Sequence, residues 1–249
     1  MSRSAFYDWL ERPAKIIREE ALNMYRTRSI MRKLKLVVTE RQAYKITTKR
    51  KHSDSVANNV LNQQFSPTQV NLVWAGDVTY LRTNQGWMYL AIVMDLYSRR
   101  VVGWSISKRM TVDLVERALH MAINIRQPKA GLMVHSDRGS QYTSGRFSRL
   151  LNKYKITASM SSAGPCLDNA VVERFFGSLK NEWLLNVVHL IRKMMKMDIE
   201  EYIRYYNHQR LHTTLGDLTP INYENLQSQG LVGLDQNTLV NQEKPNRSH

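Results

Sequence analysis

The spacing of hydrophobic positions changes along the chain, and each change predicts a different kind of element. Residues 17–36 combine apolar positions with Arg and Lys on several sides, which is typical of a basic helix. From residue 74, three apolar or β-branched runs follow one another at 74–81, 87–96 and 100–107, joined by short turns. This order predicts an antiparallel meander, and the almost continuous apolar character of the second run is typical of a central strand covered on both faces.

Helices and strands alternate after the meander. Thr111 is placed to cap a helix that runs to about Arg126, and a short strand is predicted at 131–136. A helix at 144–154 and a fifth strand at 156–160 follow. Three antiparallel strands followed by βα units predict an α/β fold, with a mixed five-stranded sheet and flanking helices.

The next segment predicts an amphipathic helix. Gly164 and Pro165 end the preceding strand, and Asp168 or Asn169 offers a side-chain oxygen to cap the new helix. One face is apolar because four hydrophobic residues recur at steps of four, three and four: Val172, Phe176, Leu179 and Trp183.

Glu173, Gly177 and Lys180 lie together on the face next to this apolar stripe. Glycine inside a helix costs about 1 kcal/mol relative to alanine, so Gly177 favours the close approach of something bulky at this point. Taken alone, the segment is also consistent with an ordinary amphipathic helix on which Glu173 is a solvated surface residue.

The two ends of the chain differ in composition from its middle. Residues 1–64 contain 14 Lys and Arg against 6 Asp and Glu, and within them 41–52 predicts a basic arm, with a solvated tail as the alternative. A last helix is predicted at 197–207. We therefore expect three parts: a basic helical N-terminal extension with a linker at 1–64, a core at 65–226, and a disordered polar tail at 227–249.

Net charge narrows the possible functions. The 249 residues contain 36 Lys and Arg against 21 Asp and Glu, which gives a formal charge of +15 and a sequence pI near 10.0. Such an excess favours a polyanionic partner, and nucleic acid fits best. The single cysteine, Cys166, excludes an intramolecular disulfide and suits a reducing cytoplasm. No apolar run approaches the length of a membrane span, so we expect a soluble intracellular protein.

Three carboxylates occur at positions that suit a ligand site. Asp77 lies within the first strand, Asp137 directly follows the fourth strand, and Glu173 lies on the later helix. If the first and fourth strands are neighbours, both aspartates reach the same end of the sheet, and the helix can bring in a third oxygen ligand. Oxygen-only ligation suits Mg²⁺ or Mn²⁺, and two such ions about 3.5–4 Å apart can promote an in-line displacement at phosphorus. Lys180, two turns beyond Glu173, is placed to hold a phosphate.

Five motifs together resemble one family of mobile-element enzymes. They are WAGDVTYL (74–81), GWMYLAIVMDLYSRRVVGW (86–104), HSDRGSQYTS (135–144), SMSSAGPCLDNAVVERFFGSLKNEW (159–183) and YIRYYNHQRLHTTLGDLTP (202–220). Over about residues 45–226 the chain resembles the second reading frame product of transposases of bacterial insertion-sequence family three. These belong to the retroviral-integrase superfamily, which has an RNase H-like core. Thirty-five residues separate Asp137 from Glu173, the spacing typical of this catalytic class, and a basic residue follows seven positions later as Lys180.

The resemblance implies a transposase that uses two Mg²⁺ or Mn²⁺ ions to cut DNA at insertion-sequence ends and to join those ends to target DNA. It implies that Asp77, Asp137 and Glu173 are catalytic metal ligands and that Lys180 contacts the donor end. We also expect six residues along the DNA path: Arg138, Gln141, Tyr142, Arg174, Gly177 and Arg210. The expected partners are DNA, further copies of the chain, and the upstream reading frame product as a fusion or partner. The expected location is the cytoplasm, on the nucleoid.

Other polar positions have competing interpretations. Asp95 ends the second strand before the LYSRR turn, and turn chemistry is favoured over catalysis there. His208 and His212 have the i, i+4 spacing of a zinc site, but no third ligand is near them in the sequence, which favours DNA contact or packing. His135 either orients the carboxylate site or ends a strand.

Two other functions stay open at this point. A shortened stretch at 16–36, where the family has a helix-turn-helix-like segment, and the unmatched tail are also consistent with a catalytically silent DNA-binding remnant. An RNase H-like nuclease on the same core would cut nucleic acid without joining it. Nicking with Mn²⁺ distinguishes an active enzyme from the remnant, and strand-transfer products distinguish the transposase from the nuclease.

Overall fold

The computed structural model describes residues 24–36, 56–162, 169–185 and 187–228. These ranges contain every residue that the sequence predicted for the functional site. Other predictions lie outside the described residues: the first part of the N-terminal extension, the basic arm, the Gly164-Pro165 stop, Cys166, the alternative cap Asp168 and the tail from residue 229 onward.

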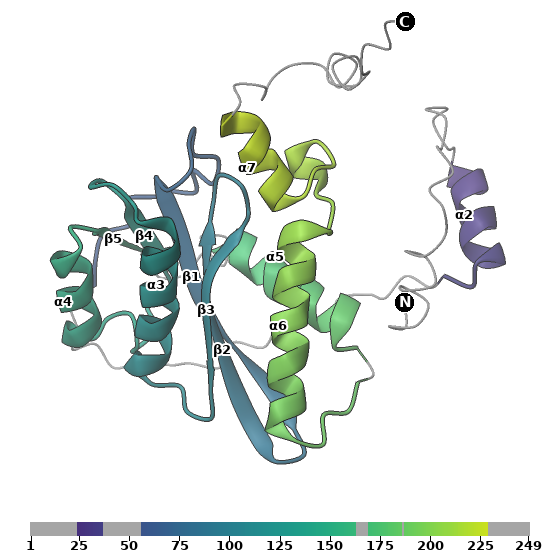
Figure 1. Cartoon of the computed structure of the whole chain (residues 1–249), viewed down its shortest axis with the longest axis horizontal. Helices are drawn as coiled ribbons and strands as arrows, with labels where there is room; N and C mark the ends of the chain where they lie inside the picture. The colour runs from purple at the N-terminus through teal and green to yellow at the C-terminus, as the bar shows by residue number, and fades with distance from the viewer. Residues whose placement is uncertain (1–23, 37–55, 163–168, 186, 229–249) are drawn as a thin grey trace, which may run out of the picture.

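Five strands form one mixed sheet in the order β3-β2-β1-β4-β5 (Figure 1). Their bounds are β1 Val73–Thr83, β2 Gly86–Asp95, β3 Val101–Ser107, β4 Met133–Ser136 and β5 Thr157–Met160. The first three strands are antiparallel, whereas β4 is parallel to β1 and β5 is parallel to β4. The predicted mixed five-stranded sheet is confirmed, and β2 is buried continuously from Leu90 to Asp95, as its apolar sequence predicts.

The pairing of β1 with β4 determines where two of the carboxylates lie. Gly76 is the last β1 residue opposite β4, and its partner is Ser136. Asp77 and Asp137 are the next residues on neighbouring parallel strands, whose backbones are roughly 4.8 Å apart in a sheet. The predicted adjacency of the first and fourth strands is therefore confirmed, and it brings the two aspartates to the same end of β4.

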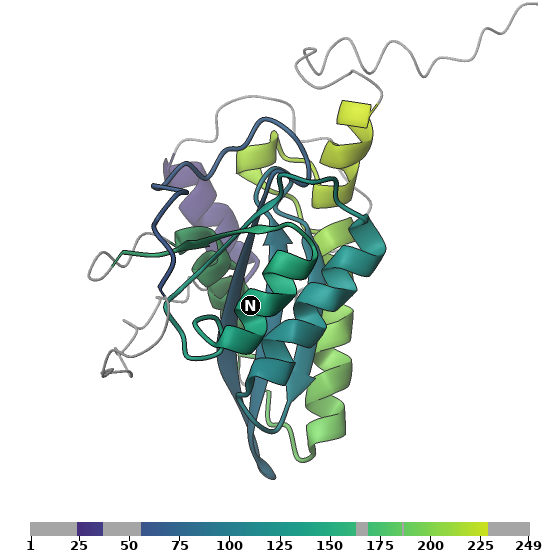
Figure 2. The ribbon, with the colours of Figure 1, turned by 90° about the vertical axis from the view of Figure 1, so that its left-hand side faces the viewer.

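Helices cover both faces of the sheet (Figures 1 and 2). α3 Val112–Arg126 and α4 Gly145–Lys153 pack on one face, while α5 Ala170–Ser178 and α6 Arg192–His208 pack on the other. Two hydrophobic clusters form, one on each face, and burial of each large apolar side chain stabilises the fold by about 1.5–3 kcal/mol. The sheet is thus a rigid support for residues at its ends.

The remaining helices differ in part from the sequence prediction. α2 Met24–Lys33 confirms a helix within 17–36, and α6 begins before its predicted start because Met195 continues its buried stripe. α7 Pro220–Ser228 was not predicted as a helix, although Pro at a first helical position is a common start signal. None of the described helices is long and apolar enough to cross a membrane.

The helix that carries Glu173 changes geometry before it reaches Lys180. α5 ends at Ser178, and the next five residues, Leu179–Trp183, form a π-helical turn where the sequence predicted a continuous α-helix. π-helical turns are rare in proteins, and those that do occur are often found at functional sites. The predicted apolar stripe is nevertheless confirmed, because all four of its members are buried: Val172, Phe176, Leu179 and Trp183.

Candidate active site

Asp77 and Asp137 are oriented by the amides that follow them. The Asp77 Oδ1 accepts a hydrogen bond from the Val78 amide at 2.7 Å, and the Asp137 Oδ1 accepts one from the Gly139 amide at 2.8 Å. A Cβ atom at position 139 would lie 2.7 Å from the Asp137 Oδ1, so a larger residue there would displace the Asp137 carboxylate. Both carboxylates are therefore held at the end of the β1–β4 pair, with Asp77 half-buried and Asp137 exposed.

α5 brings Glu173 towards the two aspartates. Its N-cap residue is Asn169, one of the two predicted caps, but the side chain makes no capping hydrogen bond. Instead, the buried Asn169 Nδ2 donates to the Gly76 carbonyl oxygen at 3.4 Å, directly before Asp77. Glu173 follows one helical turn later and is exposed. Asn169 thus positions the Glu173 helix on β1, a role that the capping pattern did not reveal.

Lys180 reaches the same region from the π-helical turn. Its Nζ lies 4.9 Å from the centre of the Tyr80 ring, three residues beyond Asp77 on β1. Burial lowers the pKa of Lys180, and the negative charge of Asp77 opposes this change. Tyr80 was not predicted as a site residue. The available signal was one aromatic residue on each strand of the β1–β2 hairpin, since the exposed Tyr80 and Trp87 meet with ring centres 5.4 Å apart.

The three carboxylates repel one another. Burial raises the pKa of Asp77 well above its ordinary value of 3.8, and the negative charges of Asp137 and Glu173 raise it further. The Val78 amide and Lys180 lower it only in part. Burial also raises the pKa of Glu173. Like charges gathered in this way favour a bound cation, because the cation removes their mutual repulsion.

The donor set fits a hard divalent cation, since the three carboxylates offer only oxygen ligands. In the part of the chain that the structure describes, no three His, Cys, Asp or Glu side chains already have the geometry to hold one ion. Glu173 is exposed on the first turn of α5, so its side chain has room to change rotamer towards the aspartates.

Gln141 and Tyr142 lie beneath the Asp137 turn. Both side chains are buried, and the Gln141 Nε2 donates to the main chain before α3 at 3.2 Å. The Tyr142 hydroxyl lies 3.4 Å from the place that a Cβ atom on Gly76 would take. Burial raises the pKa of Tyr142, and Asp77 and Asp137 raise it further. Both residues therefore pack beneath the carboxylate turn, and direct DNA contact by either residue stays a prediction.

The other four predicted DNA contacts differ in how much they are engaged. Arg138 is half-buried and donates to a main-chain carbonyl after β5 at 2.7 Å. Arg210 donates two hydrogen bonds, of 2.8 and 2.7 Å, to Glu182, which neutralises its charge. Arg174 is exposed on α5, and Gly177 is half-buried on the same helix.

The structure also shows the contacts of three other polar residues for which the sequence left alternatives. Asp95 has the predicted turn role, because its Oδ1 accepts from the Tyr97 amide at 2.9 Å. His135 is buried on β4, with its Nδ1 2.9 Å from the Ser159 hydroxyl, and joins β4 to β5. His212 packs edge-on against an α6 tyrosine ring at 4.8 Å, and burial lowers its pKa to about 4.

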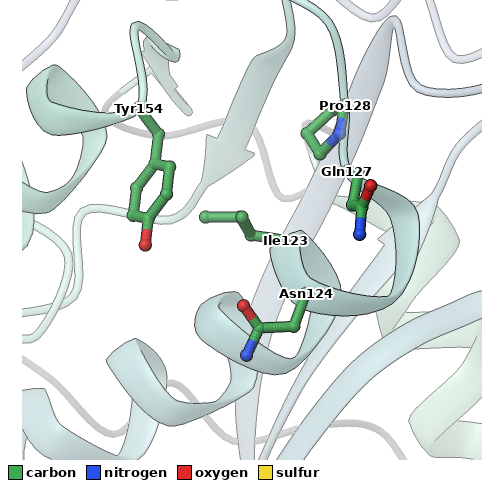
Figure 3. Close-up of a pocket in the computed structure, with 5 residues that line it drawn as sticks. All are labelled: Ile123, Asn124, Gln127, Pro128 and Tyr154. Atoms are coloured by element: carbon green, nitrogen blue, oxygen red, sulfur yellow. The ribbon is translucent and has the colours of Figure 1, made fainter.

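A separate hollow of about 550 Å³ lies at the end of α3 (Figure 3). Its lining residues come from the end of α3, the segment after it and the end of α4: Ile123, Asn124, Gln127, Pro128 and Tyr154. The lining contains no carboxylate, so the hollow is not part of the candidate active site.

Comparison with known proteins relates this chain to integrase core domains and to transposases of insertion sequences. Two regions match integrase core domain families, residues 67–166 and residues 154–220. The transposase InsF for insertion sequence IS3A of Escherichia coli (strain K12) is 45% identical over 177 residues, which cover 71% of this chain and 62% of InsF. A 31 kDa protein of insertion element IS600 from Shigella sonnei is 41% identical over 192 residues, which cover 77% of this chain and 71% of that protein.

Solved structures show the same fold. The HTLV-2 integrase catalytic core domain in complex with magnesium has a TM-score of 0.50 and 22% identity, covering 63% of this chain and 98% of that one. The chain spans less than two thirds of the length of the InsF relatives. The five-stranded sheet is thus an RNase H-like integrase core, and the chain belongs to the transposases of insertion-sequence family three, within the retroviral-integrase superfamily.

Proposed function

We propose that this chain is a metal-dependent DNA phosphoryl transferase that cuts DNA at insertion-sequence ends and joins those ends to target DNA. The observation that carries the proposal is the parallel register of β1 and β4, which places Asp77 beside Asp137, with Glu173 near enough to raise the pKa of Asp77. The InsF relatives, which are transposases by name, support the reaction class.

The three carboxylates would hold Mg²⁺ or Mn²⁺, with two ions as the proposed number. When bound, the ions supply Lewis acidity to the phosphate and lower the pKa of the attacking water or hydroxyl. The related HTLV-2 catalytic core is described in complex with magnesium, which supports this choice of metal. A catalytically silent remnant would be expected to lose one of the carboxylates, whereas this chain retains Asp77, Asp137 and Glu173.

The neighbouring residues would orient the DNA. Lys180, held over Tyr80, would bind a phosphate of the donor end as a point charge, and Asn169 would keep Glu173 close to β1. Water would first release a 3′-hydroxyl at the end of the element, and that hydroxyl would then attack a second phosphodiester. Neither step needs a Ser or Tyr nucleophile, so no covalent intermediate with the protein forms.

The proposed partners follow from this reaction. Joining two ends to one target requires several active sites near each other, so we propose a homo-oligomer assembled on DNA. A fusion with, or binding to, the product of the upstream reading frame is proposed from the resemblance alone. In the cell, the protein would act at the nucleoid.

The test is cleavage and strand transfer with a labelled duplex that carries the end of the element. Asp77→Asn, Asp137→Asn and Glu173→Gln should each lower both activities by on the order of a thousandfold, while salt-dependent DNA binding stays close to that of the parent. Glu200→Gln, a carboxylate change on the exposed side of α6, is the matched control and should leave both activities unchanged.

Each outcome selects a function. Near-parental cleavage in one of the three variants would remove that residue from the metal site. Cleavage by the parent without joined products indicates the nuclease, and DNA binding without nicking in Mg²⁺ or Mn²⁺ indicates the remnant.

A further inference from the structure

Arg99 has an unfavourable position in the turn between β2 and β3. Its φ is +62°, in the left-handed region that few residues other than glycine, asparagine and aspartate adopt. Its Nη1 is buried and has no hydrogen-bond partner among the described residues. Burial lowers the pKa of Arg99, and the positive charge of Arg174 lowers it further. Backbone strain and an unpaired buried cation at one residue are typical of functional sites.

Contacts on α5 and α6 place this turn beside the Glu173 helix. Two hydrogen bonds of 2.9 Å join Asn207, near the end of α6, to the main chain two residues after Arg99. The preceding α6 residue, Tyr206, packs with its ring 4.8 Å from that of Phe175 on α5. Burial raises the pKa of Tyr206, and the positive charges of Arg210, Arg99 and Arg174 oppose the change.

The nearby carboxylates are already bound to other cations. Asp95 and Glu224 pair with Arg126, and Glu224 also accepts from Arg100 at 2.7 Å. Glu182 accepts both hydrogen bonds from Arg210. Within the described chain, Arg99 and Arg174 form no ion pair, although the negative charge of Asp95 acts on Arg99 without a salt bridge.

We propose that Arg99 and Arg174 together bind one phosphate of the DNA backbone, separate from the phosphate that reacts. This inference rests on the proposed function, because it takes DNA as the substrate. Guanidinium groups bind phosphate through paired hydrogen bonds, and a phosphate would satisfy the buried Nη1 that has no partner.

The Arg99 turn and Lys180 lie on different sides of the carboxylates. Arg99 follows the end of β2, where Asp95 lies opposite Trp74 at the start of β1. Lys180 contacts Tyr80 on the opposite side of Asp77 along the same strand. The two cationic groups therefore lie on opposite sides of Asp77 along the direction of β1.

Arg99→Gly tests the proposal, because it removes the cation and at the same time suits the left-handed backbone. Affinity for a labelled duplex carrying the element end should fall by about 10- to 100-fold at low salt. The slope of log affinity against log salt should become shallower by about 0.9, the value for one phosphate contact. The melting temperature of the free protein should not fall, because glycine adopts this conformation without strain.

Lys155→Gly is the matched control. Lys155 also has a left-handed φ, +55°, and is exposed in the turn between α4 and β5. This variant loses one positive charge and relieves a left-handed backbone, as Arg99→Gly does. Because Lys155 is outside the proposed phosphate site, the DNA affinity and salt slope of Lys155→Gly should match those of the parent. An equal loss of affinity in Lys155→Gly would show that only total charge matters and would overturn the proposal.

Arg174→Gln should lower the DNA affinity and the salt slope in the same way, because it removes the second guanidinium from the phosphate. Arg174 is exposed on α5, so its replacement leaves the core intact. If both guanidinium groups bind one phosphate, the double variant should lose about 0.9 of slope in total rather than twice that value. A full additive loss would mean two separate phosphates and would refute the shared site.

Three further results distinguish the phosphate site from the proposed catalytic function. If Arg99→Gly has the parental affinity and slope while the parent cleaves DNA, the phosphate site is wrong and the proposed function stands. If the slope changes as expected but the parent never cleaves, the phosphate site stands and the catalytic proposal fails. If inorganic phosphate raises the melting temperature of the parent but not of Arg99→Gly, and DNA binding is the same in both, the site takes free phosphate and the DNA proposal is overturned.

Discussion

Two groups of carboxylates flank the sheet in this protein, and their charges are balanced in opposite ways. Asp95, at the end of β2, and Glu224, on α7, share the guanidinium of Arg126, with hydrogen bonds of 3.2 Å to Asp95 and 2.9 Å to Glu224. Ser98 donates to Glu224 at 2.6 Å. Burial alone would raise the pKa of Glu224, but the bonds from Arg126 and Ser98 hold it below its usual value of 4.5.

The carboxylates at the end of the β1–β4 pair lack such compensation. The negative charges of Asp137 and Glu173 add to the effect of burial and raise the pKa of Asp77, and Lys180 opposes them only weakly. The partners of Glu224 therefore stabilise its charged form, whereas the charged form of Asp77 is disfavoured until a cation is bound. The difference separates a structural ion-pair network from a site prepared for a ligand.

Glu224→Gln should have the largest effect on stability. It leaves the buried Arg126 without its main partner, and breaking a buried ion pair typically costs about 3–5 kcal/mol. Urea denaturation followed by circular dichroism measures the change in the free energy of unfolding, with Glu200→Gln as the surface control. A loss below about 0.5 kcal/mol would mean that Arg126 and Glu224 do not hold α7 to the core.

The ion pairs of Glu224 should also make the stability of the folded protein depend on pH. Because the pKa of Glu224 is lower in the folded protein than in the unfolded chain, its contribution is present above the unfolded value of 4.5. It is lost as the pH falls through the lower folded value. Melting temperatures measured from neutral to acidic pH should therefore fall more steeply in the parent than in Glu224→Gln. Parallel curves would contradict the lowered pKa.

Asp77→Asn should act in the opposite direction. Without metal, it removes a charge that two neighbours repel, so the free energy of unfolding at neutral pH should rise by about 1 kcal/mol. Mg²⁺ should raise the melting temperature of the parent more than that of the variant, since a bound ion stabilises the folded state. A destabilised Asp77→Asn protein would show that the carboxylates are not held in mutual repulsion.

The sequence predicted the carboxylate site of Asp77, Asp137 and Glu173, because its elements follow from local sequence patterns. The strand periodicity placed Asp77 within the first strand and Asp137 directly after the fourth, and the parallel pairing of these strands brings both to the same end of the sheet. The position of Glu173 followed from a helix whose apolar stripe is visible in the sequence. These features depend on residues that are close together in the chain.

The sequence did not predict the Glu224–Arg126 network, because it depends on contacts between residues that are far apart in the chain. Glu224 meets Arg126 across 98 positions of the chain, and α7 lacks the apolar stripe by which α5 was predicted. The left-handed φ of Arg99 is set by the tertiary packing of its turn, since Arg has no intrinsic preference for it. The π-helical turn at Leu179–Trp183 is likewise a product of packing.

Gly177→Ala gives the smallest of these effects and tests whether the Glu173 face is shaped for a ligand rather than for the fold. Alanine should stabilise α5 by about 1 kcal/mol, because glycine is a poor helix former. If DNA approaches between Glu173 and Lys180, affinity should nevertheless decrease by about threefold, and Gly177→Leu should impair DNA binding and transfer more than folding. Unchanged affinity and transfer in Gly177→Leu would show that this face does not need the clearance, and the absence of a side chain at position 177 would then be explained by packing alone.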